Sequence, residues 1–213
     1  MKHFKTAALV CALGFSAAAQ ADTAEWTLQG VITPAACGMV MSGNGVHDFG
    51  TVAASALKEG EYHRLDTKNN KINIDCNGAS TRAAVKFLSE RGTSMNASQA
   101  SFGLGLHGDK KIGYGQHNVN REVQVKFTPQ SDFAEGKLLE SKDKVKWSLV
   151  NSTVRTPNVN NDHYLTVANE QGAPASFTQM TMTLNSTALI SGDLVVEKEV
   201  PFRNVTTISL EYL

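Results

Sequence analysis

The sequence has no net charge, because 20 lysine and arginine residues balance 20 aspartate and glutamate residues. A protein whose main partner is nucleic acid or an anionic lipid surface usually carries an excess of basic residues. The absence of that excess argues against both classes of partner. Removal of residues 1–21 would take away two lysines and leave 18 basic and 20 acidic residues, which is still close to neutral.

Long apolar runs are also missing, with one exception at residues 7–19. That run follows two lysines, ends in a small-residue cleavage pattern and is too short to span a bilayer, which is typical of a secretory signal peptide. We therefore expect residues 1–21 to be removed, with cleavage before Asp22 or, as an alternative, before Gln20. Residues 22–213 are expected to form a single exported domain.

Cysteine is scarce, because the chain has three and Cys11 lies within the predicted signal peptide. Cys37 and Cys76 remain in the exported chain. In an oxidising compartment an isolated pair most simply forms one disulfide. The alternative is a pair of metal ligands, but no further cysteine or histidine lies at a ligand spacing from either residue.

Signals for catalysis are missing as well. No Gly-x-Ser-x-Gly motif occurs, no cysteine is left over as a nucleophile, and the carboxylates within residues 132–143 lie among lysines in a solvated stretch. The histidines outside the signal peptide show no metal-ligand spacing. We interpret them as surface or cross-strand residues: His47, His63, His107, His117 and His163. We therefore expect no enzymatic activity and no cofactor.

Residues 103–108, Gly-Leu-Gly-Leu-His-Gly, formally match the glycine-rich dinucleotide-binding motif. That motif binds a pyrophosphate when it joins a strand to the N-terminus of a helix. Here a polar segment precedes it, and residues 109–115 (Asp-Lys-Lys-Ile-Gly-Tyr-Gly) cannot begin a helix. The structure that we expect instead is a glycine-rich strand or a β-bulge.

Short runs of alternating apolar and polar residues dominate the exported chain, and helical periodicity is almost absent. This pattern predicts half-buried strands in an all-β, immunoglobulin-like sandwich. One face of the first run carries Trp26, Leu28, Gly30 and Ile32. We expect further strands at 46–52, 62–66, 72–76, 83–87, 123–127, 145–149, 164–167, 177–189 and 194–202. We also expect a hairpin through Asn77-Gly78, a loop at 90–100, and a loop or one helical turn at 131–142.

The last ten residues alternate most clearly, with Thr206, Ile208, Leu210 and Tyr212 on one face. The pattern continues to Leu213 without a polar tail, although most domains fray at their termini. Two interpretations remain open at this stage. The segment is either a C-terminal strand that closes an ordinary sandwich or a strand edge that another protein recognises.

Three features together resemble the subunits of bacterial chaperone–usher pili. They are residues 28–37 (Leu-Gln-Gly-Val-Ile-Thr-Pro-Ala-Ala-Cys), the second cysteine in a strand at Cys76, and residues 208–213 (Ile-Ser-Leu-Glu-Tyr-Leu) with their penultimate tyrosine. The closer likeness is to a poorly characterised branch of fimbria-like proteins of Gram-negative bacteria. That branch has stretches similar to residues 43–50, 102–105 and 110–113.

The resemblance implies a pilin-type immunoglobulin-like sandwich that lacks its final strand and has a hydrophobic groove beside the C-terminal strand. A periplasmic chaperone fills this groove with a donated strand and binds the terminal carboxylate of Leu213. An outer-membrane usher and other fimbrial subunits are the later partners, and the N-terminal extension of the next subunit then replaces the chaperone's strand by β-augmentation. The implied location is the periplasm in transit and then the fimbrium at the cell surface, where the fibre contributes to adhesion.

One departure concerns the N-terminal extension. If residues 28–33 are the domain's own first strand, residues 22–27 alone remain as an extension, and six residues span at most about 20 Å. Either the face of Trp26, Leu28, Gly30 and Ile32 leaves the domain to act as a donor, or the protein polymerises poorly. The rival function is a monomeric periplasmic or secreted β-sandwich that binds a small ligand or glycan. A pocket lined by aromatic residues would favour that rival, and an open groove beside Ile208 would favour the pilin.

Overall fold

The computed structural model describes residues 29, 36–89, 101–151, 154–155 and 162–213. The chain divides into two units, Met1–Thr33 and Pro34–Leu213, and all elements below belong to the second. The predicted signal peptide, the predicted loop at 90–100, and the face formed by Trp26, Leu28, Gly30 and Ile32 lie outside the described residues.

The predicted all-β fold is confirmed, and every strand pair in the described part is antiparallel. The first sheet is built around β14 (Gln179–Ser191), whose Met180, Met182 and Leu184 face the core while polar residues alternate outward. One edge of β14 pairs with β3 (Lys68–Asp75) and then β2 (Tyr62–Arg64). The other edge pairs with β9 (Glu122–Lys126) and then β8 (Gly113–Asn120).

Shorter strands complete this sheet. β1 (Gly38–Met41) pairs with β3 at the edge, and β5 (Ser101–Gly103) and β12 (Val154–Arg155) pair with β8. β6 (Leu106–His107) and β7 (Lys110–Lys111) form a separate hairpin. Residues 103–113 therefore form strands joined by glycine turns rather than a strand that leads into a helix, as expected for the glycine-rich segment.

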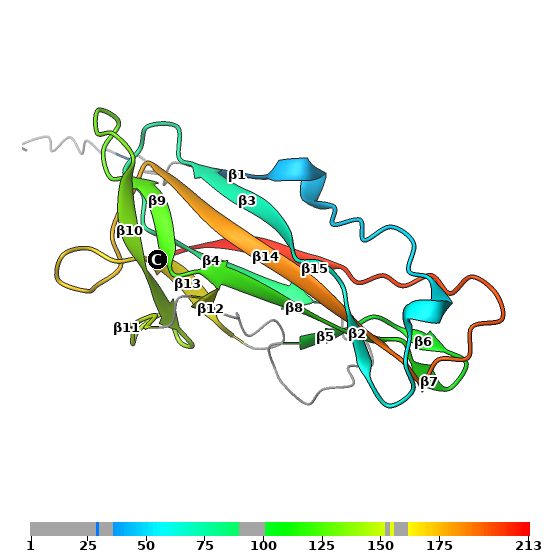
Figure 1. The fold of residues 1–213 in the computed structure, drawn as a ribbon. Coiled ribbons are helices and arrows are strands. Elements are labelled where there is room, and N and C mark those ends of the chain that lie inside the picture. Colours follow the sequence, from blue (N-terminus) through cyan, green and yellow to red (C-terminus); the bar gives the residue numbers. More distant parts are fainter. Residues whose placement is uncertain (1–28, 30–35, 90–100, 152–153, 156–161) are drawn as a thin grey trace, which may run out of the picture. The chain divides into compact units, whose positions relative to one another are not determined.

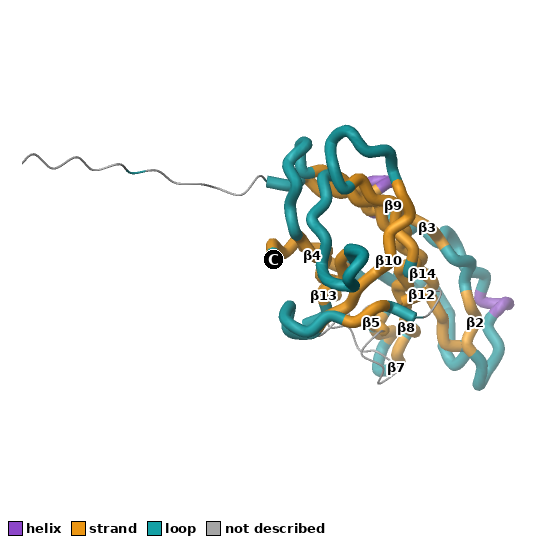
Figure 2. Tube along the Cα trace, turned by 90° about the vertical axis from the view of Figure 1, so that its left-hand side faces the viewer, coloured by secondary structure: helices purple, strands orange, loops and turns teal. Residues whose placement is uncertain are grey.

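The second sheet contains β10 (Ala134–Ser141), β13 (Tyr164–Val167), β4 (Ala83–Ser89) and β15 (Thr206–Tyr212) in that order, and β11 (Ser148–Leu149) pairs with β10. β10 joins the two sheets, because its first half pairs with β9 and its second half with β13. Figure 2 shows β4 and β13 on one side of β10, and β14 and β3 on the other. Core side chains such as Phe87, Phe177 and Ile72 fill the space between the sheets.

The predicted hairpin through Asn77-Gly78 is wrong. Both residues have positive φ angles, 52° and 78°, so the tight turn itself is present. However, β3 pairs with β1 and β14, whereas β4 pairs with β13 and β15. The turn therefore carries the chain from one sheet to the other, because the apolar faces of β3 and β4 cover the core from opposite sides.

Two predictions in the middle of the chain are also corrected. Residues 131–142 were expected to form a loop or helical turn, but β10 runs through them because Leu138 and Leu139 are fully buried. Residues 145–149 were expected to form a strand, but β11 covers Ser148–Leu149 alone. The backbone turns before β11 because the Asp143 carboxylate accepts hydrogen bonds from the N–H groups of residues 145 and 146.

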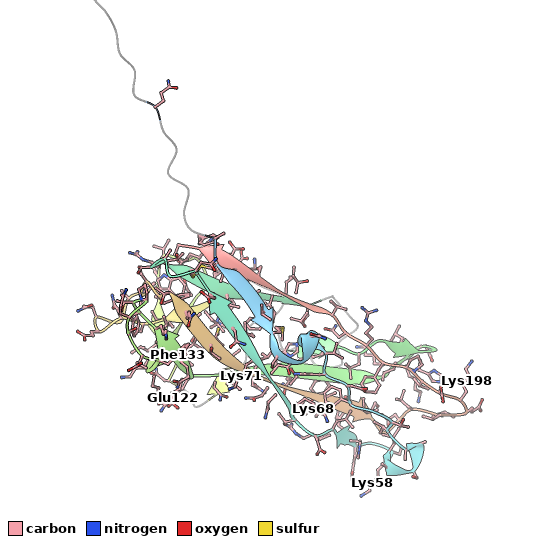
Figure 3. All side chains as sticks on the ribbon, turned by 90° about the horizontal axis from the view of Figure 1, so that it is seen from above. Lys58, Lys68, Lys71, Glu122, Phe133 and Lys198 are labelled. Carbon is pink, nitrogen blue, oxygen red and sulfur yellow. A yellow bond between two sulfur atoms is a disulfide. The ribbon has the colours of Figure 1, made fainter. Side chains whose placement is uncertain are left out.

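The strands predicted at 46–52 and 194–202 are absent, and this correction bears on function. Neither segment pairs with a neighbouring strand in the described part. The short 3-10 helix η1 (Ser42–Gly45) precedes the first segment, and η2 (Ala54–Ala56) follows it. Figure 1 shows the chain after β1 and the chain before β15 running toward the same end of the sandwich, where β2, β6 and β7 lie. Lys198 marks this end in Figure 3, and Glu122 and Phe133 mark the opposite one.

Candidate docking groove

β1 and β15 are the two ends of the strand order, so each pairs along one edge and leaves the other edge without a strand. Met39 and Met41 on β1, and Ile208 and Leu210 on β15, pack against the main core but are only partly buried. Inward-facing residues of a closed sandwich are normally covered on all sides. The core is therefore open between these two strands.

One end of this opening is tied together. Cys37 and Cys76 form the predicted disulfide, which joins the start of β1 to the end of β3. The N–H of Cys37 also donates a hydrogen bond of 2.9 Å to the hydroxyl of Tyr212 on β15. The side chain of the penultimate tyrosine thus spans the gap between the first and last strands of the described domain.

Beyond this tie lies a groove, which we call the docking groove. Its first hollow has a volume of about 420 Å³ and lies between residues 41–49 on one wall and residues 202–208 on the other. Its floor includes Phe102, Leu104, Leu184 and Ala188, most of which belong to a second hydrophobic cluster. A second hollow of about 690 Å³ continues between residues 47–57 and 194–202.

The rings of Phe49 and Phe202 meet across the groove with their centroids 6.4 Å apart, and they line both hollows. The walls lie outside the regular strands for most of their length. Within the described part of the chain, residues 47–52 make no backbone–backbone hydrogen bonds. The groove therefore combines apolar side chains with backbone donors and acceptors along residues 47–52, of which the Gly50 N–H already donates to the Asp48 carboxylate.

A polar cluster interrupts the apolar floor. The side chain of His117 on β8 is 9% exposed and its Nδ1 lies 2.6 Å from the Ser186 hydroxyl of β14. Its Nε2 lies 2.9 Å from the hydroxyl of Thr206, which also contacts Ser89 at 2.6 Å. Burial, with a smaller contribution from nearby His47, lowers the pKa of His117 to about 4, so the ring is neutral at pH 7.

His117 reaches this position because Gly115 precedes it by two residues on the same face of β8. A Cβ at Gly115 would lie 2.3 Å from the ring of Phe102, so glycine lets that ring cover the strand. The Phe102 and His117 rings then pack with centroids 4.5 Å apart.

His47 lies on the groove wall formed by residues 41–49 and lines both hollows. The pKa of His47 is lowered, chiefly by burial; the Asn70 side chain acts in the opposite direction and the charge of Lys68 adds to the lowering. Its Nε2 atom is buried and has no hydrogen-bond partner among the described residues. A buried nitrogen without a partner costs stability, so this atom marks a position at which a bound group would gain a contact.

The sequence predictions for this region have mixed outcomes. The disulfide between Cys37 and Cys76 is confirmed. The predicted face of Thr206, Ile208, Leu210 and Tyr212 lies on β15, where the two apolar residues contact the core and the outer two make hydrogen bonds; Leu213 follows the strand. That this face is recognised by another protein stays a prediction.

Sequence reasoning treated both groove histidines as surface or cross-strand residues. For His117 the cross-strand prediction is confirmed, because its ring contacts Ser186, its partner on β14, but its place in the groove was not predicted. For His117 a signal was available, because residues 113, 115, 117 and 119 alternate along β8 and Val119 is an evident core residue. No comparable signal exists for His47, which lies outside regular strands.

The described residues contain no group of three or more His, Cys, Asp or Glu side chains that could hold a metal ion. No helix among the described residues is long and apolar enough to cross a membrane.

Comparison with known proteins identifies relatives for part of the chain. The model of a family described as a protein of unknown function (DUF1120) matches residues 26–124. Protein GltF of Escherichia coli (strain K12) is 38% identical over 104 residues, which make up 45% of this chain and 41% of that protein. The matched part thus spans about two fifths of the length of this curated relative. The family match includes β1, β3 and β8 but ends before β14 and β15, which complete the groove.

Proposed function

We propose that this protein is an exported structural subunit of a chaperone–usher fimbria and that a strand donated by another polypeptide fills the docking groove. The observation that carries the proposal is the open edge between β1 and β15, where Met39, Met41, Ile208 and Leu210 are only partly buried. An exported domain with an uncovered apolar edge is prone to aggregate unless a partner covers it.

The physical mode of binding is β-augmentation. A donated strand would hydrogen-bond to the available edge of β15 and to the backbone of residues 47–52, while its alternate side chains would enter the hollows. The first donor is a periplasmic chaperone, which hands the subunit to the outer-membrane usher. Another fimbrial subunit then takes the chaperone's place, and the assembled fibre contributes to adhesion at the cell surface.

Replacing Ile208 with aspartate is expected to abolish the complex with a two-domain periplasmic chaperone co-produced in the same host. The change removes apolar contacts that contribute about 1.5–3 kcal/mol and introduces a charge into the groove. The matched control is Thr207→Asp, which alters the exposed neighbour on the opposite face of β15 and is expected to retain the complex. The measurement is co-purification from the periplasm, combined with hydrogen exchange of the wild-type subunit.

In the wild-type complex, we expect the amides of β15 and of residues 47–52 to exchange more slowly than in the isolated subunit. Accumulation of the wild-type protein as a soluble monomer, with unchanged exchange in the presence of the chaperone, would contradict the proposal. Loss of stability in Ile208→Asp would not support it by itself, because a closed sandwich would also be weakened.

The second hollow favours one alternative, a monomeric domain that binds a small ligand or glycan. Its volume of about 690 Å³ lies within the usual range for ligand pockets, and the ring of Phe49 lines it together with Lys198 and Glu199. A ligand in this hollow would protect few backbone amides of β15. Hydrogen exchange therefore separates the alternative from strand donation.

A further inference from the structure

The docking groove is not uniformly apolar along its length. Along the groove, one wall presents Met41, His47 and Phe49 in chain order, and the other presents Ile208, Thr206 and Phe202 in reverse chain order. The polar members face a floor that contains His117 and Ser186. We call His47, His117, Ser186 and Thr206 the polar centre; it lies between an apolar pair on one side and an aromatic pair on the other.

Within the polar centre the two histidines differ in the hydrogen-bond partners of their ring nitrogens. Both ring nitrogens of His117 have hydroxyl partners, on Ser186 and Thr206. These contacts hold the ring in place and leave it little capacity for a further bond. His47 instead has its Nε2 atom buried without a partner in the described part of the chain. An occupant of the groove can satisfy that atom.

The chemistry of the missing partner follows from its surroundings. Burial favours a neutral His47 ring, which offers either a donor or an acceptor at Nε2 according to its tautomer. A hydroxyl or amide side chain can match either tautomer. A carboxylate would be desolvated in this largely apolar groove, which is costly, although the charges of Lys68 and Arg203 lie close to it. An aliphatic side chain would leave Nε2 unsatisfied.

We propose that His47 selects the strand that fills the docking groove by hydrogen-bonding to a serine, threonine or asparagine side chain of that strand. This inference rests on the proposed function and specifies its partner. Because side chains on one face of a strand recur every second residue, the polar residue is flanked two positions away on each side by an apolar residue. The preceding one packs against Met41 and Ile208 and the other against Phe49, which follows His47 by two residues and whose ring meets that of Phe202, or the reverse for the opposite strand direction. The selected sequence is therefore apolar-x-polar-x-apolar.

The test uses synthetic 13-residue peptides with valine at every second position and alternating lysine and glutamate between, in which one valine at a time is replaced by serine. Binding to the purified domain is measured by fluorescence anisotropy. For the wild-type protein, we expect serine to tighten binding by about tenfold at one central position and to weaken it at positions that face the apolar pairs. In His47→Val, the same central serine is expected to bind no better than valine.

Two further variants separate selection from a general effect on the fold. His47→Gln retains a neutral donor and acceptor and is expected to keep the serine preference, at least in part. His107→Val changes a histidine of the β6–β7 hairpin, away from both hollows, and is expected to behave as the wild type.

Each outcome decides a different claim. Binding without a serine preference, or with the same preference in His47→Val, would overturn the selection by His47 and leave strand donation standing. Failure of every peptide to bind, together with no change in hydrogen exchange along β15, would overturn both.

Discussion

Replacing Cys37 with serine is expected to lower the free energy of unfolding by about 3–4 kcal/mol, because the disulfide closes a loop between residues 39 positions apart and restricts the unfolded chain. The loss is large relative to the total stability of a typical domain. The measurement is denaturant unfolding of the purified domain and its yield from the periplasm.

Reduction of the wild-type protein provides the matched control and is expected to reproduce the effect of Cys37→Ser. Cys37 is the better residue to change, because Cys76 is fully buried in the core and its replacement would add a packing defect. We also expect hydrogen exchange at residues 38–41 to accelerate, since β1 would lose its covalent tie to β3. Equal unfolding midpoints for the variant and the oxidised wild type would show that the disulfide is not stabilising.

Acidification from pH 7 to pH 4 is expected to remove about 3 kcal/mol of stability through His117. The pKa of His117 is lowered from 6.5 to about 4 in the folded protein. As the pH falls below 6.5, the unfolded chain therefore takes up a proton that the folded protein does not bind until about pH 4. Stability from this group is fully present above pH 6.5 and is lost between these two values, with about 2 kcal/mol lost by pH 5.

The measurement is urea unfolding at several pH values between 7 and 5, a range in which most carboxylates keep their charge. The lowered pKa of His47 acts in the same direction. His117→Gln, which can still hydrogen-bond to Ser186 and Thr206, is expected to be less stable at pH 7 but to depend much less on pH. An unchanged pH dependence in this variant would refute the assignment to His117.

The alternating pattern of the sequence predicted most strands of this protein for a local physical reason. β3, β4, β9, β13, β14 and β15 each place apolar residues on one face at a period of two, so the pattern reveals both the strand and its buried face. The pattern does not reveal which strand is the neighbour. The predicted hairpin through Asn77-Gly78 failed on this point, because a tight turn is equally compatible with a crossing to the other sheet.

Residues 46–52 and 194–202 show a different limit. Both segments alternate as strands do, but a strand needs a hydrogen-bonding neighbour, and the described domain supplies none. β10 is the converse case. Its charged composition favoured a loop, yet its position between the sheets and the burial of Leu138 and Leu139 make it a strand.

The sequence by itself determined the class of fold and the disulfide, because alternation and a pair of cysteines are properties that can be read along the chain. The tertiary structure alone decided that β1 and β15 face each other across an open groove, that the two unpaired segments form its walls, and that His47 and His117 meet inside it. The residues involved are separated by up to about 170 positions in the sequence. Their proximity depends on the order of strands in two sheets, which no local pattern encodes.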